Sequence, residues 1–85
     1  MKLAAEISMY PLKDQYIQPI QDFIDRLNTY ENLKVVTTAT STTVCGEYLP
    51  TMQLLAEEMQ RSHEKVGQAI FVCKFLNGDK MTNEI

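Results

Sequence analysis

Apolar and polar residues alternate over residues 2–10, which is the period of an extended strand. One side of this segment carries Leu3, Ala5, Ile7 and Met9. The other side carries Lys2, Ala4, Glu6, Ser8 and Tyr10. The pattern therefore predicts a strand with one face in a core. Pro11 is expected to end this strand, because proline cannot donate a hydrogen bond to a ladder.

Two later segments repeat apolar residues at spacings of three and four, as amphipathic helices do. The first is expected to run from a cap at Asp14 to about Asn28, with a stripe of Tyr16, Ile17, Ile20, Phe23, Ile24 and Leu27. The second is expected to begin at Pro50, which suits a first turn, and to last to about Lys65. Its stripe consists of Met52, Leu55, Met59 and Val66. We interpret both stripes as packing surfaces.

Residues 33–48 are rich in threonine and other β-branched residues, a composition that favours extended backbone. Small residues from Ala39 to Ser41 suit a tight turn, so the segment predicts a hairpin of two strands. Gly46 within the second strand indicates either a bulge or a close approach by another group.

Residues 69–76 form a nearly continuous apolar run of strand length. Its alternation places one set of side chains under the helices: Phe71, Cys73 and Phe75. The other set is Ile70, Val72 and Lys74. This second face is still quite apolar, which suggests that a partner chain covers it.

The order strand, helix, strand, strand, helix, strand is the split βαβ pattern, βαββαβ, of a ferredoxin-like α+β fold. Two right-handed crossovers place both helices on one face of an antiparallel sheet. Numbered along the chain, its strands follow the order 4-1-3-2. With 85 residues the chain is too short for two cores, so residues 1–85 are predicted to form a single domain.

Composition and charge restrict the possible partners. The net charge is −3 and no cluster of Lys or Arg occurs, which argues against binding to nucleic acid. No apolar run reaches the length of about 18 residues that a bilayer requires, so no membrane association is expected. An acidic residue as early as Glu6 is untypical of a signal peptide, and we predict a cytoplasmic protein.

Catalysis finds little support in the sequence. Two cysteines, Cys45 and Cys73, and a single histidine, His63, cannot complete a zinc site at this spacing, so no metal is expected. No nucleophile–base arrangement and no phosphate-binding glycine loop is present. We therefore predict that the protein is not an enzyme.

The predicted strand order brings the first strand beside the threonine-rich one. A carboxylate, Glu6, and several hydroxyls would then converge on the face of the sheet that the helices leave uncovered. The alternative is an exposed acid beside a solvated hairpin that binds nothing, and composition alone favours that alternative.

Two stretches carry a recognisable pattern: Ala4–Leu12, and Thr37–Thr42 followed by Gly46–Tyr48. The first resembles the opening strand of the YkoF-like thiamine-binding proteins, and the second resembles the hairpin of that family. The hairpin turn of the family commonly reads methionine, then glycine or serine, then threonine. Ser41 and Thr42 match this turn, whereas Thr40 stands where methionine is usual.

The resemblance implies a ferredoxin-like domain that forms a homodimer or homotetramer and carries no cofactor. It implies binding of thiamine, or of its hydroxymethylpyrimidine half, near the sheet where domains meet. A structural or regulatory homo-oligomer without a small-molecule ligand is the alternative.

The family ligand suggests roles for particular side chains. Glu6 could accept a hydrogen bond from the pyrimidine amino group or share the proton of the ring nitrogen. Ser8, Thr38, Ser41 and Thr42 could complete the polar set. Tyr10 or Tyr48 could stack on a ring, and a cationic thiazolium favours an aromatic face.

Overall fold

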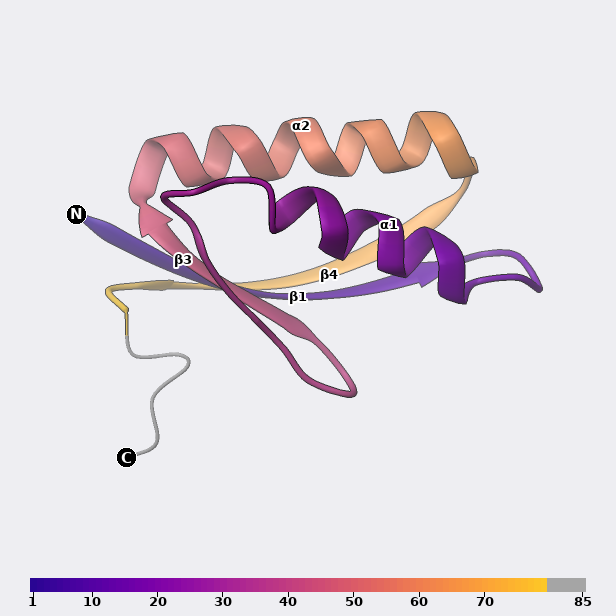
Figure 1. The fold of residues 1–85 in the computed structure, drawn as a ribbon, viewed down its shortest axis with the longest axis horizontal. Helices are drawn as coiled ribbons and strands as arrows, with labels where there is room; N and C mark the ends of the chain where they lie inside the picture. The colour runs from indigo at the N-terminus through magenta and orange to yellow at the C-terminus, as the bar shows by residue number, and fades with distance from the viewer. Residues whose placement is uncertain (80–85) are drawn as a thin grey trace.

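The structure, a computed structural model, describes residues 1–79, and residues 80–85 of the predicted domain lie outside the described part. Its elements are β1 (Lys2–Pro11), α1 (Ile17–Leu27), β2 (Lys34–Thr37), β3 (Thr42–Glu47), α2 (Tyr48–Val66) and β4 (Ala69–Asn77). The strands form one antiparallel sheet in the order β2-β3-β1-β4, and both helices lie on the same side of it (Figure 1). The predicted ferredoxin-like α+β fold and its strand order are confirmed.

The register of the sheet determines which residues share a face, because partners directly opposite each other point the same way. Strand β1 pairs with β3 from Lys2↔Glu47 to Ile7↔Thr42 and with β4 from Leu3↔Asn77 to Pro11↔Ala69. The predicted alternation along β1 is confirmed on the helix side, where Leu3, Ala5, Ile7 and Met9 are buried. Pro11 is the last residue of β1, one position later than predicted.

The core lies between the sheet and the helices. Its buried residues are Ala5, Ile7, Met9, Phe23, Leu27, Leu33, Val44, Leu54 and Leu55. From β4, Phe71 and Cys73 pack against this cluster as predicted, and the Phe71 ring lies 5.1 Å from that of Phe23. Phe75 shares their face but is 46% exposed, so the expectation that it lies under the helices was wrong. It lies on an edge strand, and the core contacts only the first half of that strand.

The ends of the helices differ from the predictions by a few residues. Helix α1 begins at Ile17 with Tyr16 as its N-cap, so Asp14 does not cap it. Helix α2 begins at Tyr48, and Pro50 lies within its first turn, where helical amides need no partner. Gly67 ends α2 with φ at +92°, a backbone conformation that favours glycine.

Gly46 permits α2 to lie close to the sheet. The β1–β3 register passes through Leu3↔Gly46 without interruption, so there is no bulge here. A Cβ atom at Gly46 would stand 2.5 Å from Thr51 Oγ1 and 3.2 Å from Leu33 Cδ1. Thus, of the two sequence interpretations, the close approach is the right one.

A buried ionic cluster joins the two helices. The Glu58 carboxylate of α2 accepts hydrogen bonds from Arg26 Nε of α1 at 2.8 Å and from the Tyr30 hydroxyl at 2.6 Å. Arg26 also donates to the Ser62 hydroxyl, and Arg61 lies 3.4 Å from Glu58. Because every charge in this cluster has a partner, burial of Glu58 at 4% exposure is tolerated. The cluster fixes α1 against α2.

We expect Gly46→Ala to destabilise the fold by about 1–3 kcal/mol, because the new methyl group overpacks the contact with Thr51. Urea unfolding monitored by circular dichroism measures this loss. The Thr51→Ala change removes the clashing hydroxyl, so the double variant should lose less than the sum of the single losses. Strictly additive losses would contradict the proposed contact.

The ionic cluster predicts a pH dependence of stability. Burial disfavours the Glu58 carboxylate, but hydrogen bonds from Tyr30 and Arg26 and the charges of both arginines outweigh it, so the pKa of Glu58 falls below its ordinary value of 4.5. A pKa that is lower in the folded state gives stability that is fully present above 4.5 and is lost as the pH falls through the folded value.

We therefore expect Glu58→Gln to cost about 2–4 kcal/mol at pH 7, because Arg26 loses its buried partner. The difference between the two proteins should shrink below about pH 4.5, where wild-type Glu58 is itself neutralised. Urea titrations at pH 7, 5 and 3.5 test this expectation. A difference that does not change with pH would show that the charge of Glu58 contributes nothing to stability.

Candidate ligand-binding site

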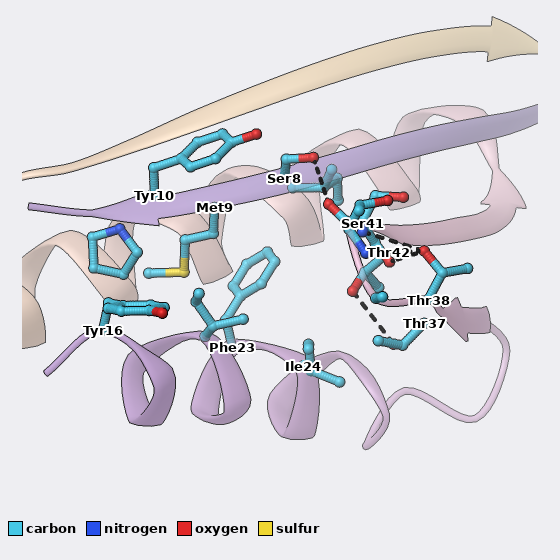
Figure 2. A pocket seen from close by; sticks show the side chains of 15 residues that line it. Ser8, Met9, Tyr10, Tyr16, Phe23, Ile24, Thr37, Thr38, Ser41 and Thr42 are labelled. Carbon is cyan, nitrogen blue, oxygen red and sulfur yellow. Dashed lines mark hydrogen bonds between the residues drawn. The ribbon is translucent and has the colours of Figure 1, made fainter.

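A cavity of about 450 Å³ lies between the end of β1, helix α1 and the tip of the β2–β3 hairpin (Figure 2). It exists because β1 is longer than its neighbour on that side. The β1–β3 ladder ends at Ile7↔Thr42, whereas pairing with β4 continues to Pro11↔Ala69. Beyond Ile7 the hairpin separates from β1. Helix α1 covers the resulting gap between β1 and the hairpin tip.

The cavity has one apolar wall and one polar wall. Helix α1 contributes Ile20, Phe23 and Ile24. The hairpin tip contributes Thr37, Thr38, Ala39, Thr40, Ser41 and Thr42. Tyr10 and Tyr16 also line it, and both are about half exposed, which places them at its mouth.

Hydrogen bonds of Thr38 and of Ser8 hold the hairpin tip in place. The Thr38 N–H donates to the Ser41 carbonyl at 2.9 Å, and the Thr38 hydroxyl accepts from the amides of Thr40 and Ser41. The Ser8 hydroxyl of β1 donates to the Thr40 carbonyl at 3.1 Å. This bond ties the tip to β1 across the gap.

The remaining hydroxyls of the hairpin differ in whether they have a hydrogen-bond partner within the described part of the protein. Those of Thr37 and Thr42 lie 3.3 Å apart and satisfy each other. The Ser41 hydroxyl forms no hydrogen bond with any residue from 1 to 79, and its side chain is half-buried at the cavity. Of the hairpin hydroxyls predicted to bind a ligand, Ser41 is thus the most available donor.

Five of the seven sequence-predicted site residues line this cavity: Ser8, Tyr10, Thr38, Ser41 and Thr42. Tyr48 lies at the other end of β1, where its N–H donates to the Met1 carbonyl. Glu6 lies on the uncovered face, where Lys74 Nζ is 3.6 Å from its carboxylate.

The sequence interpretation placed Glu6 and the hairpin hydroxyls in one hollow on the uncovered face, and the structure does not form that hollow. The register sets Glu6 opposite Thr43, whereas Thr42 is opposite Ile7 and therefore points to the helix side. A shift of one residue along β3 separates the two faces. The cavity consequently lies beside α1.

Sequence reasoning missed the wall that α1 supplies. The stripe containing Ile20 and Ile24 was interpreted as packing alone, and Tyr16 was counted as part of it. The signal that could have revealed this wall is length. A ten-residue β1 beside a six-residue β3 leaves part of the longer strand without a neighbour.

The part of the chain that the structure describes gives the cavity lining no formal charge, since the side chains there are hydrocarbons, hydroxyls, phenols and a thioether. Within residues 1–79 no group of three His, Cys, Asp or Glu side chains is placed to hold a metal ion. The helices of this part of the chain are too short or too polar to cross a membrane. The arrangement is suited to an uncharged ligand with one apolar side and one polar side.

Comparison with solved structures shows several proteins of the same architecture. SP2199 from Streptococcus pneumoniae matches with a TM-score of 0.86 at 24% identity, over 98% of this chain and 93% of its own. MJ1052 from Methanocaldococcus jannascii matches with a TM-score of 0.78 at 23% identity, over 99% and 88%.

TM0486 from Thermotoga maritima, a protein assigned provisionally to thiamine biosynthesis or salvage, matches with a TM-score of 0.80. Its identity is 17%, over 88% of this chain and 82% of its own. No protein-family model and no curated protein matches the sequence. The chain shares the fold of these proteins. At such identities the likeness establishes the architecture alone.

Proposed function

We propose that the protein binds the aminopyrimidine half of thiamine in the cavity between β1, α1 and the hairpin tip, without converting it chemically. The observation that carries this proposal is the cavity itself, which has an apolar wall, a hydroxyl wall, two tyrosines at its mouth and no charge. The architecture shared with TM0486 supports the choice of ligand class.

The two walls match the two kinds of surface on an aminopyrimidine. Its ring face and methyl group would lie against Phe23 and Ile24, and its polar edge would meet the hydroxyl of Ser41. A volume of about 450 Å³ falls within the range of small-molecule sites. The ligand would be oriented by few polar groups and held mainly by burial.

Charge determines which form of the vitamin would be bound. Because no Lys or Arg of residues 1–79 lines the cavity, a phosphate ester would lose its hydration without gaining a cationic partner there. A thiazolium ring would instead stay at the mouth, where the faces of Tyr10 and Tyr16 can favour a cation by about 0.5–2 kcal/mol. The unphosphorylated forms are therefore the proposed ligands.

Absence of turnover is part of the proposal. No histidine, cysteine or carboxylate is among the cavity residues of the described chain, so none can serve there as a general base of suitable pKa. A hydroxyl nucleophile needs an adjacent base to activate it, so the hydroxyls of this cavity are proposed to orient the ring without reacting with it. A role in carrying or buffering the vitamin fits such a site.

Calorimetric titration tests this proposal with three compounds: 4-amino-5-hydroxymethyl-2-methylpyrimidine, thiamine and thiamine diphosphate. We expect saturable heat from the first two and weaker binding of the diphosphate. Ser41→Ala should reduce affinity by roughly three- to tenfold, because one hydrogen bond to the ligand is lost. Gln60→Ala, an exposed change on α2, is the control. Absence of heat from both unphosphorylated compounds at millimolar concentration would end the proposal.

The uncovered face of the sheet supports a second function, self-association. Its exposed apolar side chains are Tyr10, Val36, Ile70, Val72 and Leu76. Glu6 and Lys74 lie among them, and such an acid–base pair can exchange partners across a two-fold axis. We propose that a second copy of the chain covers this face. Because Tyr10 also lines the cavity, association would narrow its mouth.

Val72→Lys should prevent this association, because an added charge would be buried within the proposed contact. Sedimentation equilibrium should show a dimer or tetramer for the wild type and a monomer for the variant. Leu49→Lys, at a position on α2 that is 74% exposed, is the matched control. A wild-type protein that sediments as a monomer at micromolar concentration would contradict the proposal.

A further inference from the structure

Hydrogen bonds at its two ends fix which edge of β1 each residue faces. Within a strand, successive residues direct their N–H and C=O groups to alternate sides. The Leu12 N–H donates to the Gln68 carbonyl, and the Lys2 carbonyl accepts from the Gly78 N–H, so even-numbered residues face β4. The Met1 carbonyl accepts from the Tyr48 N–H, so odd-numbered residues face β3.

This alternation singles out Met9. It is odd-numbered, and its backbone therefore faces the hairpin side, but the β1–β3 ladder has already ended at Ile7↔Thr42. Continued past its end, the register would set Met9 opposite Thr40, but within residues 1–79 no backbone hydrogen bond joins the two, and the Thr40 carbonyl accepts from the Ser8 hydroxyl instead. Neither the N–H nor the C=O of Met9 has a hydrogen-bond partner on this side among residues 1–79.

The surroundings of Met9 make this unusual. The residue is 8% exposed, belongs to the core and lines the cavity. Buried backbone groups are nearly always paired, and an unpaired one carries a desolvation penalty. The next residue that faces the hairpin side, Pro11, has no N–H at all. Met9 thus supplies the only backbone N–H that β1 directs into the gap beyond Ile7.

We infer that the backbone of Met9 is the recognition edge of the site. It would bind a planar heterocycle in which a ring nitrogen acceptor stands next to an exocyclic amino group. The ring nitrogen would accept from the Met9 N–H and the amino group would donate to the Met9 C=O, as a neighbouring strand would do. This inference rests on the proposed function and names the edge of the ligand that is recognised.

Recognition by the backbone also agrees with the neutral lining. A carboxylate such as Glu6 is not needed to accept a hydrogen bond from the amino group, because the Met9 carbonyl would accept it within the cavity. The amidine-like edge of an aminopyrimidine satisfies both Met9 groups at once, and a ring without the amino group leaves the carbonyl unpaired. Discrimination between such ligands would thus lie in the backbone of β1.

Amide-resolved NMR on the full ¹⁵N-labelled chain tests this inference. The probes are 4-amino-5-hydroxymethyl-2-methylpyrimidine and the same compound without its amino group. With the first probe, the Met9 amide proton should move downfield and its exchange with solvent should slow at least roughly tenfold. The amides of Ser8 and Tyr10, which already pair with β4, serve as internal references and should keep their exchange rates. The second probe should bind roughly tenfold more weakly.

The outcomes separate the two proposals. If the resonances of Ser41 and Thr42 move with the first probe while the Met9 amide exchanges as before, this inference is overturned and the proposed function stands. If no cavity resonance moves with either probe or with thiamine, both are overturned.

Met9→Pro provides a second measurement, because proline removes the N–H but leaves the β4 ladder bonds of Ser8 and Tyr10 in place. Protection of those two amides reports that the variant is folded. Met9→Ala, which also removes the side chain but keeps the N–H, is the matched reference. A folded Met9→Pro that binds the aminopyrimidine as tightly as Met9→Ala would overturn the inference, whereas an affinity roughly tenfold or more below that of Met9→Ala supports it. Should the variant fail to fold, the exchange of the wild-type Met9 amide decides.

Discussion

The unequal pairing of β1 on its two sides is the constraint on which the site depends. One edge is paired with β4 along nearly its whole length, whereas the other edge loses β3 after Ile7. A backbone edge left open inside a folded domain must be covered by something, because unpaired amides and carbonyls are costly away from water. Here the cover consists of the α1 side chains and the hairpin tip, and the space between them is the cavity.

The two covering elements are held in different ways. The tip is fixed by hydrogen bonds of its own, centred on Thr38, and by the Ser8 bond to the Thr40 carbonyl. Helix α1 is fixed from its far side by the bonds between Arg26 and Glu58, which leave its other side free to face the sheet. Phe23 and Ile20 can therefore pack against the core and line the cavity at the same time. A substitution in the ionic cluster would therefore shift α1 and change the shape of the cavity that α1 lines.

The fold could be predicted from the sequence because each element carries its own periodic signal. The alternation from Leu3 to Met9 and the helical stripe through Phe23 both follow from simple spacing, and the element order then limits the topology. The same periodic signals also explain why several predicted site residues line the cavity. They place the segments that contain Ser8 and Ser41 near each other in the sheet.

The faces of β3 could not be predicted in the same way. Residues 40–43 are four hydroxyl-bearing residues in a row, so no contrast between polar and apolar positions indicates which of Thr42 and Thr43 turns toward the helices. Only the ladder settles this question, by setting Thr42 opposite Ile7. The unpaired Met9 backbone was hidden for a related reason. Hydrogen-bonding groups of the main chain leave no mark in a sequence, and their availability depends on where a neighbouring strand ends.

The order of the hydroxyl residues and the unpaired Met9 backbone together bear on how this site would distinguish ligands. The side chains around the cavity are neutral and many of them already have partners, so they shape the space more than they select its contents. Under the proposed function, selection falls to groups that have no partner within residues 1–79, of which the Met9 backbone and the Ser41 hydroxyl are the most buried. A main-chain edge does not change when side chains are substituted, provided that β1 keeps its register with β4. Under the proposed function, Thr40 in place of the methionine usual in similar hairpins leaves the Met9 backbone unaffected, because Met9 belongs to β1, on another wall of the cavity.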